Sequence, residues 1–159
     1  MEQNSNPKFI EYRLPDDASD SKLDTDIRAC RERIEAEPAN ADNYFRLATY
    51  MIIKEKPGDA IELLEQCLRR NPEHMEAYFL LGNSYIKHSQ HEIAARYYLK
   101  ALKLDPGHIP SLFNIGLCYA ELGIKKKAVS AFKKFYALEE SNQWREEAKY
   151  QLYKLGVNL

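Results

Sequence analysis

This chain of 159 residues has almost no excess of one charge sign, few cysteines and no long apolar runs. The formal net charge is −1, so the chain lacks the basic excess that general nucleic-acid binders usually carry. No stretch approaches ~18 consecutive apolar residues, and we expect no membrane insertion. The opening segment, residues 1–15, has no continuous apolar run of the kind found in a secretory signal. We therefore expect a cytoplasmic protein.

The chain is also poor in the residues and motifs of catalytic and metal sites. Its cysteines number three, and Cys30, Cys67 and Cys118 fall on apolar faces of expected helices. They indicate reduced core thiols in a reducing compartment rather than a disulfide framework. There is no Gly-rich phosphate loop and no nucleophile elbow. His88 and His91 have a spacing seen in metal sites, but no third ligand completes a set. We expect no enzyme activity, no metal and no cofactor.

What the chain does have is an internal period of 34 residues. The stretch from Tyr78 to Pro106 aligns with the segments one period before and after it, and large and small positions are mostly kept. A fixed period in this range predicts a solenoid of repeated units. The units are residues 41–74, 75–108 and 109–142.

Each unit carries two helix patterns. In the middle unit, Tyr78, Leu81, Gly82 and Tyr85 follow the i, i+3, i+4, i+7 spacing of one helix face. A second face follows at i, i+4 and i+7. The predicted helices lie near 42–54, 58–70, 76–88, 92–104, 110–122 and 126–138. Small residues in the first helices leave room for close approach of the paired helix; they are Ala48, Gly82 and Gly116. Prolines that stop each second helix follow one period apart, at Pro38, Pro72 and Pro106.

The order of these residues resembles the tetratricopeptide repeat. Over one period the middle unit reads aromatic, Leu, Gly, Tyr, Ala, aromatic, Ala, Pro, and it matches the family pattern at all eight positions. The third unit departs twice, with Phe135 at a small position and Glu140 in place of the proline. The resemblance implies an all-α, right-handed superhelical solenoid of three antiparallel helix-pair repeats. It identifies the fold strongly and the function weakly, because repeat folds serve many partners.

The segments on either side of the repeats are expected to differ from one another. Residues 1–20 are polar and predict a flexible arm. Within it, the run from Phe9 to Leu14 is either disordered or packed locally, or it lies in a groove of this chain or a neighbour. Residues 21–37 predict an N-terminal capping helix with Ser21 as its N-cap. Residues 143–155 predict a C-terminal capping helix, with Trp144 in its apolar stripe and Ser141-Asn142 as its cap.

By resemblance, the first helices line a concave groove that binds a peptide. The groove positions in this sequence are Phe45, Arg46, Thr49, Ile52, Phe79, Leu80, Asn83, Ile86, Phe113, Asn114, Leu117 and Ala120. Phe45, Phe79 and Phe113 are spaced by one period and form an aromatic ladder. An exposed apolar ladder is typical of a partner-binding surface. The alternative is that the three rings pack on the neighbouring first helices and fill the inner curve themselves.

The two groove asparagines refine this expectation. Asn83 and Asn114 fall at asparagine positions of the carboxylate clamp found in chaperone-binding members of the family. The cations of that clamp do not match, because Phe79 stands at the lysine position, and Trp144 and Ala148 stand at the next basic pair. We therefore expect no heat-shock clamp. The asparagines are instead suited to bonding the backbone of an extended peptide.

Together these patterns predict a non-enzymatic adaptor that binds an apolar peptide or helix of a partner protein in its concave groove. The alternative is a self-assembling scaffold, in which the groove, the repeat ends or the N-terminal arm make a homo-oligomer. The sequence favours neither an extended nor a helical ligand.

Overall fold

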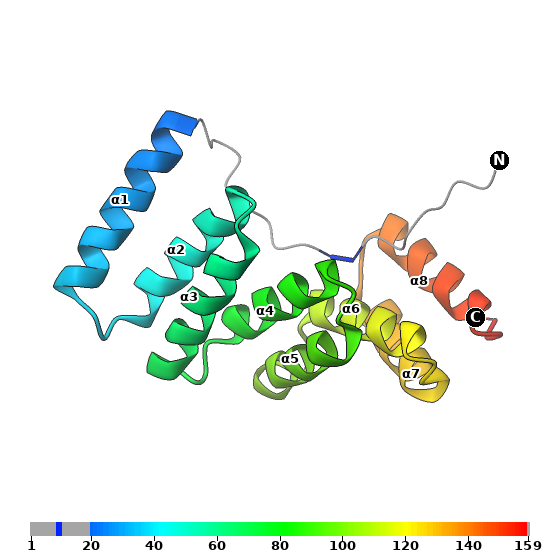
Figure 1. The fold of residues 1–159 in the computed structure, drawn as a ribbon. Helices are drawn as coiled ribbons and strands as arrows, with labels where there is room; N and C mark the ends of the chain where they lie inside the picture. The colour runs from blue at the N-terminus through cyan, green and yellow to red at the C-terminus, as the bar shows by residue number, and fades with distance from the viewer. Residues whose placement is uncertain (1–8, 11–19, 159) are drawn as a thin grey trace.

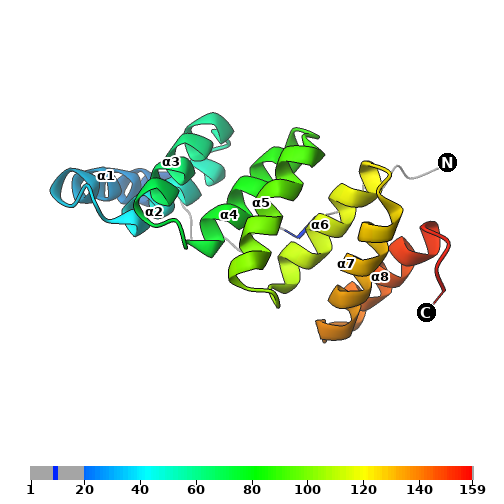
Figure 2. The ribbon, with the colours of Figure 1, turned by 90° about the horizontal axis from the view of Figure 1, so that it is seen from below.

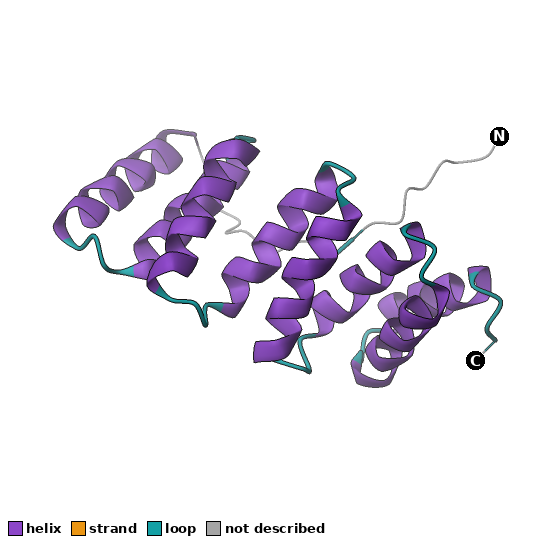
Figure 3. Ribbon diagram, turned by 60° about the horizontal axis from the view of Figure 1, so that its bottom comes forward, coloured by secondary structure: helices purple, strands orange, loops and turns teal. Residues whose placement is uncertain are grey.

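The computed structural model describes residues 9–10 and 20–158. Within these residues the secondary structure is entirely helical, with short loops between the helices (Figure 3). The helices are α1 (Asp20–Ala36), α2 (Ala41–Ile53), α3 (Pro57–Arg70), α4 (Met75–Lys87), α5 (His91–Leu104), α6 (Ile109–Glu121), α7 (Lys125–Leu138) and α8 (Asn142–Lys154). They follow one another in a curved row from α1 at one end to α8 at the other (Figures 1 and 2).

The row is an all-α superhelical solenoid of helix pairs. Helices α2 and α3, α4 and α5, and α6 and α7 pack as pairs, while α1 packs on α2 and α8 packs on α7. The buried apolar side chains form three successive clusters along the row rather than one central core. This is the arrangement expected of a solenoid, in which each unit buries its apolar face against its neighbours.

Close approach in the second and third pairs depends on a glycine facing a ring. A Cβ added at Gly116 would lie 2.7 Å from Cε1 of Phe132, and one added at Gly82 would collide with the ring of Tyr98. Ala48, at the same position of the first pair, is fully buried. The expectation that these three positions leave room for the paired helix is therefore confirmed.

The three cysteines are buried and unpaired, as the sequence predicted. Cys30, Cys67 and Cys118 each belong to a different apolar cluster. Burial raises the pKa of both Cys67 and Cys118 to about 12, so these thiols stay protonated at neutral pH. They act as small apolar core residues.

Several helix ends differ from the sequence-based expectation. Helices α2 to α7 each begin one residue earlier than predicted. Ser21 was expected to be an N-cap, but it lies inside α1, where its carbonyl accepts a hydrogen bond from Thr25 Oγ1 at 3.0 Å. Ser141 is the N-cap of α8 but makes no side-chain cap bond. Caps are weak local signals, and the packing of each helix shifts its ends by a residue or two.

The N-caps of the first helices repeat with the period of the chain. Asn40, His74 and His108 stand 34 residues apart, and their side chains accept the N–H groups of Asp42, Ala77 and Ser111. The acceptor in both histidines is Nδ1, at 3.3 Å from the donor nitrogen. A histidine can cap in this way only while Nδ1 is unprotonated.

The first helices also end in a repeated turn. Glu55, Ser89 and Gly123 have positive φ values of 55°, 56° and 70°. In each case the next residue donates its N–H to a carbonyl five residues earlier, as Lys56 does to Met51 at 2.9 Å. This is the Schellman motif, which pairs the last carbonyls of a helix and favours glycine at the positive-φ position.

We predict that Gly123→Ala and Ser89→Gly shift stability in opposite directions. A positive φ costs a non-glycine residue about 1–2 kcal/mol, and glycine loses about 0.5–1 kcal/mol of chain entropy on folding. Gly123→Ala should therefore lower the free energy of unfolding by about 0.5–1 kcal/mol and Ser89→Gly should raise it by a similar amount, as measured by urea denaturation.

The matched control for this prediction is Gly58→Ala. A Cβ at either Gly58 or Gly123 would meet nothing within 4 Å, but Gly58 lies in the first turn of α3 and has no positive φ. The same chemical change there should stabilise the chain by about 0.5–1 kcal/mol. Equal effects of Gly58→Ala and Gly123→Ala would contradict the assignment of strain to the Schellman turn.

We also predict that His108 makes stability depend on pH. Burial lowers the pKa of His108 from its ordinary value of about 6.5, against the opposing charges of Asp105 and Glu76. The unfolded chain then binds the proton more readily, so the free energy of unfolding should fall as pH drops from about 6.5 through the lower folded-state pKa.

His108→Asn tests this dependence, because asparagine keeps an N-cap acceptor and does not titrate. Urea denaturation of both proteins between about pH 5 and 8 should give a smaller loss of stability at low pH for His108→Asn. Parallel curves for the two proteins would show that this histidine does not carry the dependence.

Candidate functional site

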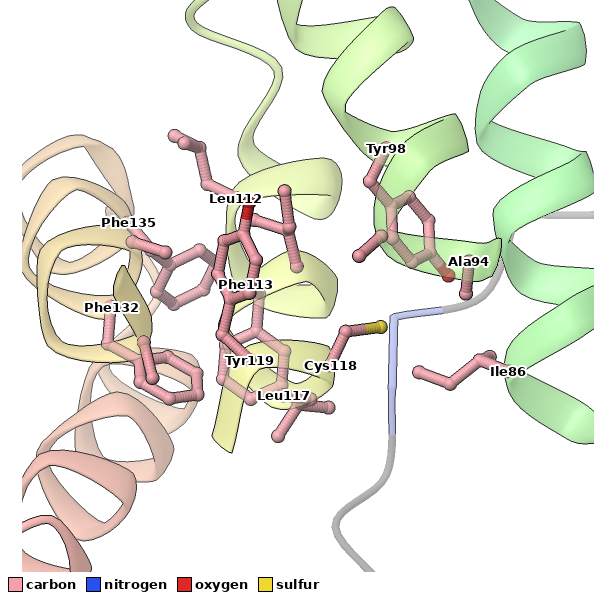
Figure 4. Close-up of a cluster of buried hydrophobic side chains, with 14 of the residues drawn as sticks. Ile86, Ala94, Tyr98, Leu112, Phe113, Leu117, Cys118, Tyr119, Phe132 and Phe135 are labelled. Carbon is pink, nitrogen blue, oxygen red and sulfur yellow. The ribbon is translucent and has the colours of Figure 1, made fainter. Parts of the chain in front are cut away.

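The groove on the inner side of the curved row is already occupied by a segment of the same chain. Phe9 and Ile10 lie inside the curve, far in sequence from the helices beside them (Figure 1). The close-up shows this segment passing between Ile86 of α4 and the side chains of Leu117 and Cys118 of α6 (Figure 4). The groove is therefore formed by the first helices of the second and third helix pairs.

Asn114 of α6 binds the main chain of Ile10 through both ends of its amide group. Ile10 donates its N–H to Oδ1 of Asn114 at 2.7 Å, and Nδ2 of Asn114 donates to the carbonyl oxygen of Ile10 at 2.8 Å. The side chain of Asn114 is fully buried. A paired donor and acceptor of this kind recognises a peptide backbone without regard to the side chain of the bound residue.

The orientation of the Asn114 amide is fixed from the opposite side by two further residues. Nδ2 of Asn114 also donates to Oδ1 of Asn83 at 3.0 Å, and it lies 3.3 Å from the hydroxyl oxygen of Tyr98. The hydroxyl of Tyr98 in turn donates to Oδ1 of Asn83 at 2.7 Å. With two acceptors behind it, Nδ2 cannot exchange places with Oδ1 without leaving buried groups unpaired. Oδ1 is thereby held toward the groove.

Tyr98 connects this network to the packing of the second helix pair. Its ring lies against Gly82, and its hydroxyl reaches the groove between α4 and α6. Burial raises the pKa of Tyr98 well above its usual range. The hydroxyl therefore keeps its proton at neutral pH and remains the donor to Asn83.

A cavity of about 500 Å³ adjoins the Phe9 side of this segment. It lies between the C-terminal part of α2, the start of α3 and one face of α4. Its walls combine apolar side chains with a few polar ones: Phe9, Ile52, Ile53, Glu55, Pro57, Leu80, Asn83, Ser84, Lys87 and His88. A concave, mostly apolar cavity with a few polar groups is the usual form of a ligand site.

Several residues predicted for the groove do lie together there. Ile52, Leu80 and Asn83 line the cavity. Ile86 and Leu117 belong to the apolar cluster against which Phe9 and Ile10 pack. Ala120 is partly buried against the same cluster, and Asn114 of α6 is hydrogen-bonded to Ile10.

Except for Ile52, the predicted residues from the first repeat lie apart from this site. Arg46 is exposed on α2, and Thr49 is buried with its hydroxyl donating to the carbonyl of Arg46 at 2.7 Å. Phe45 is half-buried, and its ring centroid lies 4.5 Å from that of His74. None of the three lines the cavity beside Phe9.

The prediction that the aromatic ladder is exposed is wrong for Phe79 and Phe113. Phe79 is 3% exposed and Phe113 is fully buried. Phe79 packs on the ring of His108 at 5.0 Å, and Phe113 packs on Phe135 and Trp144 at 4.9 and 5.2 Å. Phe79 thus fills the junction with the next first helix, as in the alternative that the sequence left open, and Phe113 fills the corresponding junction with α8.

The same contacts explain the two unusual residues at the end of the row. His74 and His108 receive the phenylalanine of the preceding pair, and Trp144 of α8 takes this place for Phe113. Phe135, which replaces a small residue of the repeat pattern, is fully buried and packs on the same ring. Phe135 thus helps the third unit to pack on α8, which is not the first helix of another pair.

Sequence reasoning missed two parts of the site. The hydrogen bonds of Tyr98 to Asn83 and Asn114 were not anticipated, because the repeat pattern assigned this position only a packing role. Lys87 and Ser84 lie outside the groove positions that the family resemblance supplied. The sequence had offered a groove of this chain as one place for the run from Phe9 to Leu14, and Phe9 and Ile10 do lie there. The rest of that run, residues 11–14, lies outside the described residues.

The described residues offer no competing metal or membrane site. Among residues 9–10 and 20–158, no group of three or more His, Cys, Asp or Glu side chains is placed to hold a metal ion. None of the helices in this part of the chain is long and apolar enough to cross a bilayer.

An all-α superhelical row of helix pairs with a groove on its inner face defines a helical-repeat protein. The sequence model of the tetratricopeptide repeat matches residues 54–109 and, in a second overlapping match, residues 80–143. These matches cover more than half of the chain, which therefore belongs to the tetratricopeptide repeat family.

Known proteins share this repeat in different settings. The protein O-mannosyl-transferase Tmtc3 of Drosophila melanogaster is 30% identical over 90 residues, which are 56% of this chain and 10% of that protein. The chain thus spans about a tenth of the length of this curated relative.

Solved structures resemble most of the chain. The crystal structure of MamA has 23% identity and a TM-score of 0.70, and the match covers 85% of this chain and 87% of MamA. YrrB, described as a TPR protein with an unusual peptide-binding site, has 21% identity and a TM-score of 0.71, over 85% of this chain and 77% of YrrB. At these identities the likeness supports the fold.

We predict that Phe113→Ala destabilises the chain far more than Phe45→Ala, although both residues occupy the same repeat position. Removing a fully buried phenylalanine costs about 3–5 kcal/mol, and removing a half-buried one costs less. The measurement is the free energy of unfolding in urea. Equal and small effects would mean that Phe113 does not fill the junction with α8.

Proposed function

We propose that this chain is a non-enzymatic adaptor that holds an extended, apolar segment of a partner protein in the groove between α4 and α6. The observation that carries the proposal is the Asn114 amide, buried and held in one orientation by Asn83 and Tyr98, with both of its polar atoms bonded to a peptide backbone. The three buried, reduced thiols fit a protein that acts in a reducing compartment such as the cytoplasm.

The geometry favours an extended ligand over a helical one. In an α-helix, the N–H and C=O groups of an interior residue bond within the helix. Here the N–H and C=O of Ile10 both bond the side chain of Asn114, which an extended segment allows. The mixed lining of the adjoining cavity suits an apolar side chain next to the bonded residue. One peptide in one such groove is expected to bind with micromolar affinity, about −8 kcal/mol.

We predict that peptides selected for this groove lose about tenfold in affinity when Asn114 is replaced by alanine. Selection from a displayed library of random peptides should use the full-length chain with Phe9→Ala and Ile10→Ala, since these two side chains occupy the groove. Each lost backbone hydrogen bond is worth about 0.5–1.5 kcal/mol, and 1.4 kcal/mol corresponds to a factor of ten.

The control is Arg46→Ala, which alters an exposed side chain on α2 outside the cavity and should leave affinity unchanged. Circular dichroism checks that each variant is folded. If no peptide is enriched, or if Asn114→Ala binds the enriched peptides as tightly as its parent, the groove is not a peptide site. Light scattering over a dilution series tests the scaffold alternative, because an adaptor should stay monomeric.

A further inference from the structure

We propose that Phe9 and Ile10 are an internal ligand of the groove, and that the partner segment which replaces them carries the same extended pair of an aromatic and an aliphatic residue. The first half of this inference concerns the chain alone. The second half rests on the proposed function and narrows its ligand from an apolar segment to a defined pair.

The main-chain contacts of Ile10 are those of a bound peptide rather than of a passing loop. Its N–H and C=O are both paired with one buried side chain, at 2.7 and 2.8 Å, across a sequence separation of 104 residues. Asn114 gains two charge-neutral hydrogen bonds from this arrangement. Without an occupant, Oδ1 and one N–H of Nδ2 would need water or another peptide as a partner, while Nδ2 would keep its hydrogen bond to Asn83.

The side chains of the segment meet surfaces of matching character. Phe9 and Ile10 both pack on the apolar cluster that contains Ile86 and Leu117. The ammonium group of Lys87 lies 5.9 Å from the centre of the Phe9 ring, within the range of a cation–π interaction. An aromatic side chain is therefore favoured at the position of Phe9, next to the bonded aliphatic residue.

The cavity beside Phe9 explains how a partner could displace an internal ligand. About 500 Å³ remains between Phe9 and the walls formed by Ile52, Ile53 and Leu80. A partner that places the same pair in the groove and a further apolar side chain in this cavity would bury surface that the internal segment leaves exposed.

The covalent link to the repeats gives the internal ligand an advantage that can be measured. Nine residues separate Ile10 from the start of α1 at Asp20. A short tether corresponds to an effective concentration of about millimolar, and a weak site has a dissociation constant of roughly 10–100 µM. The internal segment should therefore weaken the binding of an external peptide by about 10- to 100-fold.

The test uses the full-length chain and a fluorescein-labelled peptide with the sequence of residues 6–14, NPKFIEYRL. Fluorescence anisotropy should show that it binds the Phe9→Ala, Ile10→Ala chain at least about 10 times more tightly than the wild-type chain. A peptide in which only the amide nitrogen of the isoleucine is methylated should lose binding, because it cannot donate to Asn114. A peptide with alanine in place of the Phe-Ile pair should also fail to bind.

A second measurement reports on the internal ligand with no peptide present. The side-chain amide signals of Asn114, identified by their loss in Asn114→Ala, should have the same chemical shifts in the wild-type chain as in the peptide-bound double variant. They should differ in the free double variant, and dilution of the wild-type chain should not change them. The Arg46→Ala chain is the control and should behave as the wild type.

Each contrary result has a distinct meaning. Equal binding of the labelled peptide to the wild-type chain and the double variant overturns the internal ligand. Signals that change on dilution together with a dimeric mass overturn it in favour of a segment supplied by a second copy. If library-selected peptides bind at Asn114 but lack an aromatic–aliphatic pair, the proposed function stands and this narrower ligand is rejected.

Discussion

The contact between the Tyr98 ring and Gly82 is the constraint on which both the fold and the groove depend. Only a residue without a Cβ allows α4 and α5 to approach this closely, because any side chain at Gly82 would enter the ring. The same approach carries the Tyr98 hydroxyl through the pair to Asn83, and Asn83 holds the Asn114 amide. A packing contact of the repeat is thus also the support of the site.

Fully buried polar networks are favourable only when each member is paired, and this one meets that condition. Asn83 accepts from Tyr98 and Asn114, and Asn114 pairs both remaining directions with Ile10. The last two bonds come from a segment that is not part of the solenoid. The groove therefore needs the main chain of one peptide residue to complete the hydrogen bonds of Asn114. In this structure Ile10 of the chain's own N-terminal segment provides it.

The aromatic ladder has a different role from the one its spacing favoured. Phe79 and Phe113 sit where a concave face is expected, yet the ring of Phe79 packs on His108, the N-cap of α6, and the ring of Phe113 packs on Trp144 of α8. Burial of two large rings at the junctions leaves the polar asparagines and smaller aliphatic residues to form the groove surface. The chain thus buries the rings of Phe79 and Phe113 at the helix junctions and keeps Asn83 and Asn114 on the groove surface.

The sequence by itself determined the helix pairs, their order and the small residues at their closest approach, because these follow from local spacing that repeats every 34 residues. It also marked Asn83 and Asn114 as residues of the inner face. It could not decide whether a phenylalanine on that face is buried at a helix junction or exposed to solvent, since both arrangements give the same sequence periodicity. Nor could it decide whether Ile10 lies in the groove of its own chain, because the partner of Ile10 lies 104 residues away and their contact follows no repeat. Such contacts depend on the curvature of the assembled row, and only the tertiary structure brings the two ends of those hydrogen bonds together.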